Sequence, residues 1–184
     1  MPRHKSKISN PYKLASLVLL LIVIGLLVYA FSYVFSPEDI TKVALPVAIP
    51  ELSTNNYSLV NVSTNIVGDV GAVTLTGNCR AVAASVEPLQ SKSIQNALDG
   101  KYDKRPNGHD IAAEAFQTLG IDVLMVKVTE QKEDAYFSKI IIRQGDTILN
   151  LDARPSDAIA IALRVKAPIY MNNELLQKNG VKVC

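Results

Sequence analysis

The sequence has no tryptophan, only two cysteines and only 6% aromatic residues among its 184 residues. Two cysteines are too few for a disulfide-rich scaffold, and no Cys/His spacing resembles a zinc site. No low-complexity tract occurs and 48% of the residues are hydrophobic, which excludes a disordered chain. No glycine-rich phosphate loop, Cys-x-x-Cys motif or nucleophile elbow is present either. The length allows one modest globular domain plus an appendage.

Negative charge is missing from the first part of the chain. Residues 1–13 contain four basic residues and no acidic ones, and residues 14–35 contain no charged residue at all. From Ser36 onward there are 15 basic residues, which is the total of 19 minus these four, against 17 acidic ones. This balance of −2 argues against a nucleic-acid-binding protein that relies on bulk positive charge.

The uncharged run at residues 14–35 is long enough to cross a membrane. At about 1.5 Å per residue, 22 helical residues span the hydrocarbon core of roughly 30 Å. Tyr29 and Tyr33 suit the membrane interface, and Pro37 would end the helix just outside it. A cleaved signal peptide is the alternative, but its apolar stretch is normally about 7–15 residues. The run therefore predicts a single transmembrane helix.

The basic tail sets the expected orientation. Basic residues flanking a span stay on the cytoplasmic side, so residues 1–13 are predicted to form a cytoplasmic tail. The soluble domain would then lie outside the cytoplasm, as part of a single-pass membrane protein. Cys79 and Cys184 could pair in such an oxidising compartment. Two unpaired thiols, one buried and one terminal, are the slightly favoured interpretation.

The rest of the chain divides into a linker and a domain. Residues 36–56 contain Pro37, Pro46 and Pro50 and no sustained period, which is typical of a stalk. Residues 57–184 alternate short strand-like and helix-like segments without a regular order. Strands are expected at 57–62, 70–76, 80–85, 121–129, 135–143, 147–152, 168–171 and 181–183, and helices at 88–98, 110–119, 155–163 and 174–178. This order predicts an α+β fold with a compact, mostly antiparallel or mixed sheet and three to four short helices.

The most informative polar stretch is Asp152-Ala-Arg-Pro-Ser-Asp157, which joins a strand end to a helix start. Pro155 suits the first helical position, and Asp157 at the third could cap the helix backbone. Asp152 could hold a hydrated Mg²⁺ or Mn²⁺, while the guanidinium group of Arg154 donates hydrogen bonds to a phosphate oxygen. The alternative is a surface ion pair between Asp152 and Arg154, worth about 0–1 kcal/mol.

A second stretch, Arg105-Pro-Asn-Gly-His-Asp110, also leads into a helix. His109 is the only histidine outside the tail, and its imidazole titrates nearest neutrality, so it could act as a general base or a metal ligand. A capping or solvated role is the more common fate of such a histidine. Asp110 is a candidate both for capping and for catalysis.

These two stretches carry a resemblance to a known family. The run from Asp152 to Arg164, followed by Ala167-Pro-Ile-Tyr170, resembles the signature of the bifunctional nuclease family. Arg105-Pro106 and His109-Asp110 stand where that family has an Arg-Pro-x-Thr-His-Asp block. Ala97-Leu-Asp-Gly100 and Ala135-Tyr-Phe137 fit the same pattern, so the resemblance covers about residues 57–183.

The resemblance implies a compact α+β domain that hydrolyses both RNA and DNA. Carried over by position, the catalytic candidates are His109, Asp110, Asp152 and Asp157, the substrate-binding candidates are Arg105 and Arg154, and Asp152 is the metal candidate. Three positions depart from the family pattern. Gly108 replaces a threonine, Glu87 replaces a glycine, and Gln90 replaces a glutamate, which would weaken metal binding if that glutamate is a ligand.

The leading functional hypothesis is therefore a membrane-anchored nuclease. A divalent metal near Asp152 would activate water, Arg154 or Arg105 would hold the phosphate, and His109 would move protons. The expected partners are nucleic acid as substrate, the membrane through residues 14–35, and further copies of the chain in a homo-oligomer. The alternative is a non-catalytic binding or assembly module on the cell surface, which Gln90 favours.

Overall fold

The computed structural model describes residues 11–34 and 49–184; the side chains of residues 11–14, 17 and 31–34 are outside that description. The chain forms two compact units, residues 1–47 and residues 48–184. The second unit begins at Ala48, before the predicted boundary at residue 57, because residues 49–56 pack onto the domain.

The described part of the first unit is one helix, α1 (Pro11–Val34). Among the described residues, no helix meets the length and hydropathy needed to traverse a membrane. The predicted span at residues 14–35 lies partly outside the described residues, and so does most of the predicted stalk at 36–56. Of the predicted tail at 1–13, only the backbone of residues 11–13 is described.

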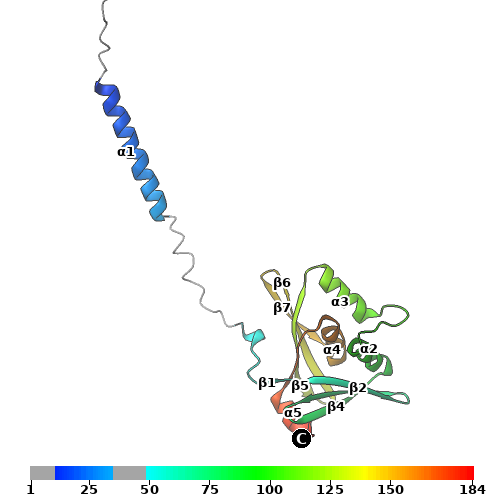
Figure 1. The fold of residues 1–184 in the computed structure, drawn as a ribbon. Coiled ribbons are helices and arrows are strands. Elements are labelled where there is room, and N and C mark those ends of the chain that lie inside the picture. Colours follow the sequence, from blue (N-terminus) through cyan, green and yellow to red (C-terminus); the bar gives the residue numbers. More distant parts are fainter. Residues whose placement is uncertain (1–10, 35–48) are drawn as a thin grey trace, which may run out of the picture. The chain divides into compact units, whose positions relative to one another are not determined.

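The second unit is α+β, as expected, but it contains two sheets where a single one was predicted (Figure 1). The first sheet has the order β1-β8-β5-β6-β7. Its strands are β1 (Tyr57–Leu59), β8 (Ile169–Asn172), β5 (Asp122–Lys132), β6 (Ala135–Gln144) and β7 (Thr147–Ala153). β5 and β8 run parallel and the other neighbours antiparallel, so this sheet is mixed.

The second sheet is antiparallel throughout, with the order β2-β3-β4-β9. Its strands are β2 (Asn61–Val67), β3 (Val70–Gly77), β4 (Arg80–Val86) and the short β9 (Val181–Lys182). The predicted strand at 57–62 is in fact split between the two sheets. Val60, between its two parts, is buried in the core.

Four helices and one 3₁₀ turn accompany the sheets. They are α2 (Pro88–Leu98), α3 (Gly108–Thr118), α4 (Pro155–Val165), α5 (Asn173–Asn179) and the turn Pro50–Leu52. Pro88 and Pro155 occupy the first helical positions, where the missing N–H costs nothing. α4 packs against α2, α3, β5 and β6, and α2 packs on β2 and β3. α2, α3 and α4 thus lie together on one side of the domain, whereas α5 packs against β4, β5 and β8 (Figure 1).

The core explains why α4 is apolar all round. Ala158, Ile159, Ala160 and Ala162 are buried, because the helix is covered by two other helices and a sheet. Gly71 marks the closest approach of α2 to the second sheet. A Cβ there would lie 2.7 Å from the Cβ of Ser91, so only glycine fits.

Residues 49–56 cover the other face of the five-stranded sheet. The buried Lys127 donates hydrogen bonds of 2.6 Å to the carbonyl oxygens of Glu51 and Ser53. Burial lowers the pKa of this ammonium group. The contact joins the turn at Pro50 to the domain, on the face where Ile141 is fully buried.

Cys79 and Cys184 form a disulfide, so the slightly favoured prediction of two unpaired thiols was wrong. Cys79 lies in the turn between β3 and β4, and Cys184 is the last residue of the chain. The Cα atoms are 5.2 Å apart because β9 pairs with β4 and brings the chain end to that turn. In the chain-entropy model a loop of about 100 residues contributes about 4.7 kcal/mol to stability.

Candidate functional site

The start of α3 fixes His109 through a reciprocal cap. The side-chain oxygen of Asn107 accepts hydrogen bonds from the backbone N–H groups of His109, at 2.8 Å, and Asp110, at 3.2 Å. One carboxylate oxygen of Asp110 accepts from the backbone N–H of Asn107 at 2.8 Å. This is a capping box, so the capping role predicted for Asp110 is confirmed.

The second oxygen of Asp110 joins α3 to α4. It accepts from Nε of Arg164 at 2.5 Å, and the side chains of Asp110 and Arg164 are only 3% and 8% exposed. Burial raises the pKa of Asp110, but the Asn107 N–H and the Arg164 guanidinium outweigh it and hold that pKa below its ordinary value. Both carboxylate oxygens therefore have partners within the protein; the catalytic role predicted for Asp110 stays a prediction.

Ser93, on α2, contacts the pair of Asp110 and Arg164 through Arg164. Its hydroxyl oxygen accepts hydrogen bonds of 3.1 Å from Nδ2 of Asn107 and from Nη2 of Arg164. The same oxygen lies 2.9 Å from Nδ1 of His109. A hydroxyl has one proton and two lone pairs. Because both lone pairs face donors, Ser93 gives its proton to Nδ1, and the proton of a neutral His109 must sit on Nε2.

Nε2 of His109 faces Asp157 at the start of α4. It lies 3.1 Å from Oδ1, and the Arg154 guanidinium donates from Nε to Oδ2 at 2.8 Å. Burial raises the pKa of Asp157, but the hydrogen bonds and charges of Arg154 and His109 outweigh it, so the pKa lies below its ordinary value. The same carboxylate raises the pKa of Arg154. Asp157 makes no capping bond, so the predicted capping role is wrong: its side chain turns to Arg154 and His109 instead.

Asp152 lies apart from this cluster. It stands opposite Lys139 in the β6–β7 register and forms an ion pair of 2.7 Å with it, with its own side chain 83% exposed. The predicted alternative, an ion pair between Asp152 and Arg154, is therefore wrong. Arg154 pairs instead with Asp157, because Arg154 is the residue before α4 and Asp157 lies three residues later, in the first turn of the helix.

Arg105 lies in the loop before α3. It is exposed and forms no ion pair with any residue that the structure describes. Its guanidinium is free to bind an anion.

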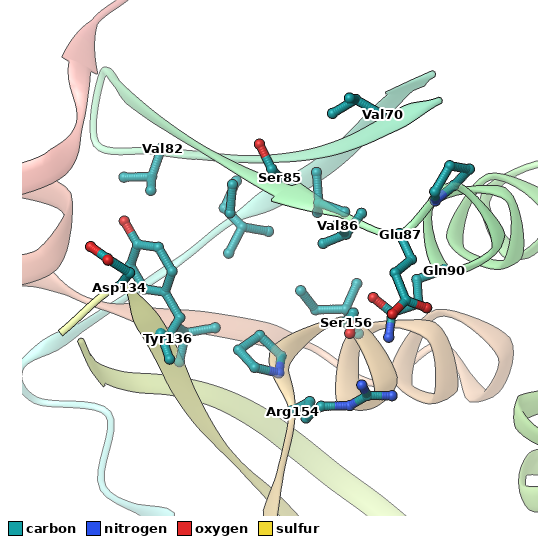
Figure 2. Close-up of a pocket in the computed structure, with 18 of the residues that line it drawn as sticks. Val70, Val82, Ser85, Val86, Glu87, Gln90, Asp134, Tyr136, Arg154 and Ser156 are labelled. Carbon is teal, nitrogen blue, oxygen red and sulfur yellow. The ribbon is translucent and has the colours of Figure 1, made fainter. Parts of the chain in front are cut away.

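Gln90 and Glu87 lie at the edge of a cavity of about 810 Å³ that also reaches Arg154 and Ser156. Figure 2 shows Glu87 and Gln90 at the start of α2, facing the turn that carries Arg154 and Ser156. The position where the family resemblance expects a glutamate therefore does adjoin the Arg154 side chain.

Sequence reasoning missed three members of the cluster, Ser93, Asn107 and Arg164. Ser93 belongs to the buried face of α2 together with Ile94, and Arg164 is the one charged residue of α4 beyond its first turn. A polar residue on a helix face that is otherwise apolar was the available signal, because such a residue needs a polar partner.

The described residues do not gather a metal-ligand set. Within residues 11–34 and 49–184, no group of three or more His, Cys, Asp or Glu side chains is placed to hold a metal ion. The carboxylate of Asp152 is shared with Lys139, and that of Asp157 with Arg154 and His109. A divalent ion at Asp152 would thus depend on water and substrate for most of its ligands.

Fold and site together define an α+β domain whose polar cluster joins two Arg-Pro segments at the starts of two helices. The chain belongs to the family of the bifunctional nuclease domain, whose model matches residues 75–184.

Three relatives illustrate the similarity. "Bifunctional nuclease 1" of Oryza sativa subsp. indica is 37% identical over 82 residues, which are 43% of this chain and 25% of that protein. "Bifunctional nuclease 2" of Arabidopsis thaliana is 35% identical over 98 residues, 52% of this chain and 30% of that protein. An uncharacterized protein of Mycobacterium tuberculosis is 32% identical over 96 residues, 51% and 57% respectively. The chain thus spans less than two thirds of each of these relatives.

Proposed function

We propose that this domain is a nuclease that hydrolyses phosphodiester bonds of RNA, DNA or both at the cluster of His109, Asp157 and Arg154. One observation carries the proposal. The Asp157 carboxylate, held ionised, joins an imidazole to an arginine whose side chain is 69% exposed. Membership of the bifunctional nuclease domain family and the names of the plant relatives support it.

The two arginines would bind the phosphate. Arg154 directs Nε and Nη2 toward Asp157, at 2.8 and 3.4 Å, which leaves other N–H donors of the fork for a phosphate oxygen. Arg105, exposed in the loop before α3, would supply a second positive charge. Two arginines on separate segments suit a diester in which the charge is delocalised over two oxygens.

Asp157 would orient the attacking water and His109 would hold Asp157 in place. In the tautomer that Ser93 imposes, His109 is a donor to Asp157 rather than a free base. Hydrolysis balances as follows: the water oxygen bonds to phosphorus, the bond to the leaving oxygen breaks, and the water proton ends on the leaving oxygen. Asp157 accepts a hydrogen bond from the water and stays ionised throughout.

Dependence on Mg²⁺ or Mn²⁺ is part of the proposal. A divalent ion would neutralise developing charge on the phosphate, and Asp152 is the carboxylate outside the cluster that would face it through water. Asp152→Asn tests this role, because it keeps the shape and removes the charge. Loss of activity with an unchanged melting temperature would support the role, and full activity would reject it.

The decisive experiment uses the full-length protein in detergent with single-stranded DNA and RNA, in the presence of Mg²⁺, Mn²⁺ or EDTA. Asp157→Asn should abolish cleavage, while Asp122→Asn, a surface carboxylate paired with Arg143, should not. Absence of cleavage by the native protein under every condition would favour the second candidate.

That second candidate is a non-catalytic binding or assembly module at the cell surface. Gln90 favours it, because an amide stands beside the Arg154 turn where the family resemblance expects a carboxylate. The assay above separates the two, and Gln90→Glu adds a further test. A gain of cleavage in that variant would show that the native chain has lost a catalytic group.

We also propose that residues 14–35 anchor the protein as a single-pass membrane protein, with residues 1–13 in the cytoplasm and the domain outside. The disulfide supports this placement, because disulfides persist in oxidising compartments. Protease added to intact cells should remove the domain, and complete protection would reverse the orientation. A homo-oligomer stays a prediction; the exposed Leu149 and Leu151 on the edge strand β7 favour it.

A further inference from the structure

A cavity lies between the two sheets and reaches the polar cluster only at Arg154. Its volume is about 810 Å³. The walls come from β3 and β4 of one sheet, from β5, β6 and β8 of the other, and from α4. This size lies within the range of about 300–1,000 Å³ that is usual for small-molecule sites.

The interior of this cavity is lined by apolar side chains. Six of the lining residues are aliphatic side chains or methionine that are almost fully buried: Val73, Leu75, Val82, Val128, Ile159 and Met171. An occupant that lies against these walls must itself be apolar over most of its length, because a buried unpaired polar group is costly.

The rim of the cavity is acidic. It carries the three carboxylates of Asp69, Glu87 and Asp134 and one cation, Arg154. Arg154 is already bonded to Asp157 at 2.8 Å, so its charge is partly neutralised before any ligand arrives. The excess of negative charge disfavours an anionic ligand and favours a cationic one.

The two ends of the rim differ. At one end Glu87 and Gln90 lie near Arg154, and at the other Asp134 lies beside Tyr136 (Figure 2). Asp134 forms no ion pair within the described part of the chain. The Tyr136 hydroxyl accepts a hydrogen bond of 2.9 Å from Asn179, which fixes the ring. A carboxylate beside a fixed aromatic ring is a favourable place for an ammonium group.

We propose that this cavity binds an apolar molecule that carries one positively charged group, such as a primary alkylamine, with the apolar part between the sheets and the ammonium group beside Asp134 and Tyr136. The proposal is independent of nuclease activity, because neither the apolar walls nor this end of the rim belongs to the cluster at His109. A molecule long enough to cross the cavity would end near Arg154.

The chain has three methionines, and one of them reports on the cavity. Met171 lines it, whereas Met125 on β5 does not. Full-length protein with ¹³C-methyl methionine, purified in detergent, would be titrated with hexylamine, hexan-1-ol and hexanoate, three ligands with the same chain. Hexylamine should shift the Met171 methyl signal at the lowest concentration and hexanoate at the highest, while the Met125 signal stays in place.

Matched variants test the two parts of the proposal. Ala84→Leu fills the cavity and should remove the Met171 response to all three ligands. Ala83→Leu, on the exposed side of the same strand, should keep it. Asp134→Asn should raise the dissociation constant of hexylamine by about two- to fivefold and leave that of hexanol unchanged. Glu133→Gln, the neighbouring charge outside the cavity, should change neither.

Three outcomes would overturn the proposal. Equal or stronger binding of hexanoate would refute the preference for a cation. An unchanged hexylamine affinity in Asp134→Asn would refute the position of the ammonium group. A Met171 response that persists in Ala84→Leu, or no response to any ligand in the native protein, would show that the cavity is not the binding site.

Discussion

The hydroxyl oxygen of Ser93 lies 2.9 Å from Nδ1 of His109 and is at the same time the acceptor for two other side chains. This relationship selects one tautomer of the imidazole, with the proton on Nε2 facing Asp157. Ser93 thereby acts on the candidate site from α2, through His109.

The first prediction concerns Ser93→Ala. The change leaves donors of Asn107 and Arg164 and the Nδ1 atom of His109 without their partner, so the free energy of unfolding should fall by about 1–3 kcal/mol. The ¹⁵N shifts of the imidazole should show a loss of the pure Nε2–H tautomer. Denaturant unfolding and NMR measure the two effects, and Ser85→Ala on the exposed part of β4 is the control. An unchanged tautomer in Ser93→Ala would contradict the conclusion that the Ser93 hydroxyl donates its proton to Nδ1 of His109.

The second prediction concerns the buried ion pair between Asp110 and Arg164. Arg164→Met should lower the free energy of unfolding by about 3–5 kcal/mol, because it leaves the Asp110 carboxylate buried with only the Asn107 N–H. The double variant with Asp110→Leu should recover part of this loss, since no charge is then buried alone. Chemical denaturation of the single and double variants measures the loss and its recovery. Arg143→Met, in the exposed ion pair with Asp122, is the control. If Arg164→Met lowers the free energy of unfolding by less than about 1 kcal/mol, the pair contributes no more than an exposed ion pair does.

The third prediction is a loss of stability in acid. The pKa values of Asp110 and Asp157 lie below the ordinary value of 3.8, so the unfolded chain binds these protons more readily than the folded chain. The resulting stabilisation is present above pH 3.8 and is lost as the pH falls through the lower pKa values of the folded state. Melting temperatures between pH 7 and pH 2 measure it. Asp110→Asn should flatten the acid limb of the curve, and an equally steep limb in that variant would assign the effect to other carboxylates.

The fourth prediction separates binding from chemistry at Asp157 and Arg154. Arg154→Lys should reduce kcat/KM for a phosphodiester substrate by at least about tenfold, because an ammonium group cannot reproduce a forked grip on phosphate and Asp157. Asp157→Asn should lower kcat further with little change in KM. Steady-state kinetics on both variants, with Arg143→Met in the exposed pair with Asp122 as a surface control, measure the difference. If both variants raise KM by the same factor and leave kcat unchanged, Arg154 and Asp157 have only a binding role.

The order of helices and strands in the domain could be predicted from the sequence, because the residues that begin and end these elements act locally. Pro88 and Pro155 begin the two helices that were predicted there, and β5 and β6 pair where two successive strands were expected. The division into two sheets was not predictable, because the break at Val60 lies inside one continuous β-rich run. Which strands pair is decided by packing between residues far apart in the sequence.

The candidate site was predictable only at its surface. His109, Arg154 and Asp157 were recognised from helix starts and from the family resemblance, and the structure brings these three together. Asp152 was misplaced relative to Arg154 because the proline turn sends the two side chains to different partners. Ser93 and Arg164 form the support behind the site, and their role depends on three helices meeting, which no single segment of sequence reveals.

The bond between Cys79 and Cys184 closes residues 79–184 into one covalent ring that contains the whole polar cluster and all four helices of the domain. A protease that cuts once inside this ring, for example in the exposed loop around Tyr102, separates nothing: both pieces stay linked until the bond is reduced. Replacing Cys184 by serine would open the ring. This one side chain therefore decides whether a nicked domain stays in one piece.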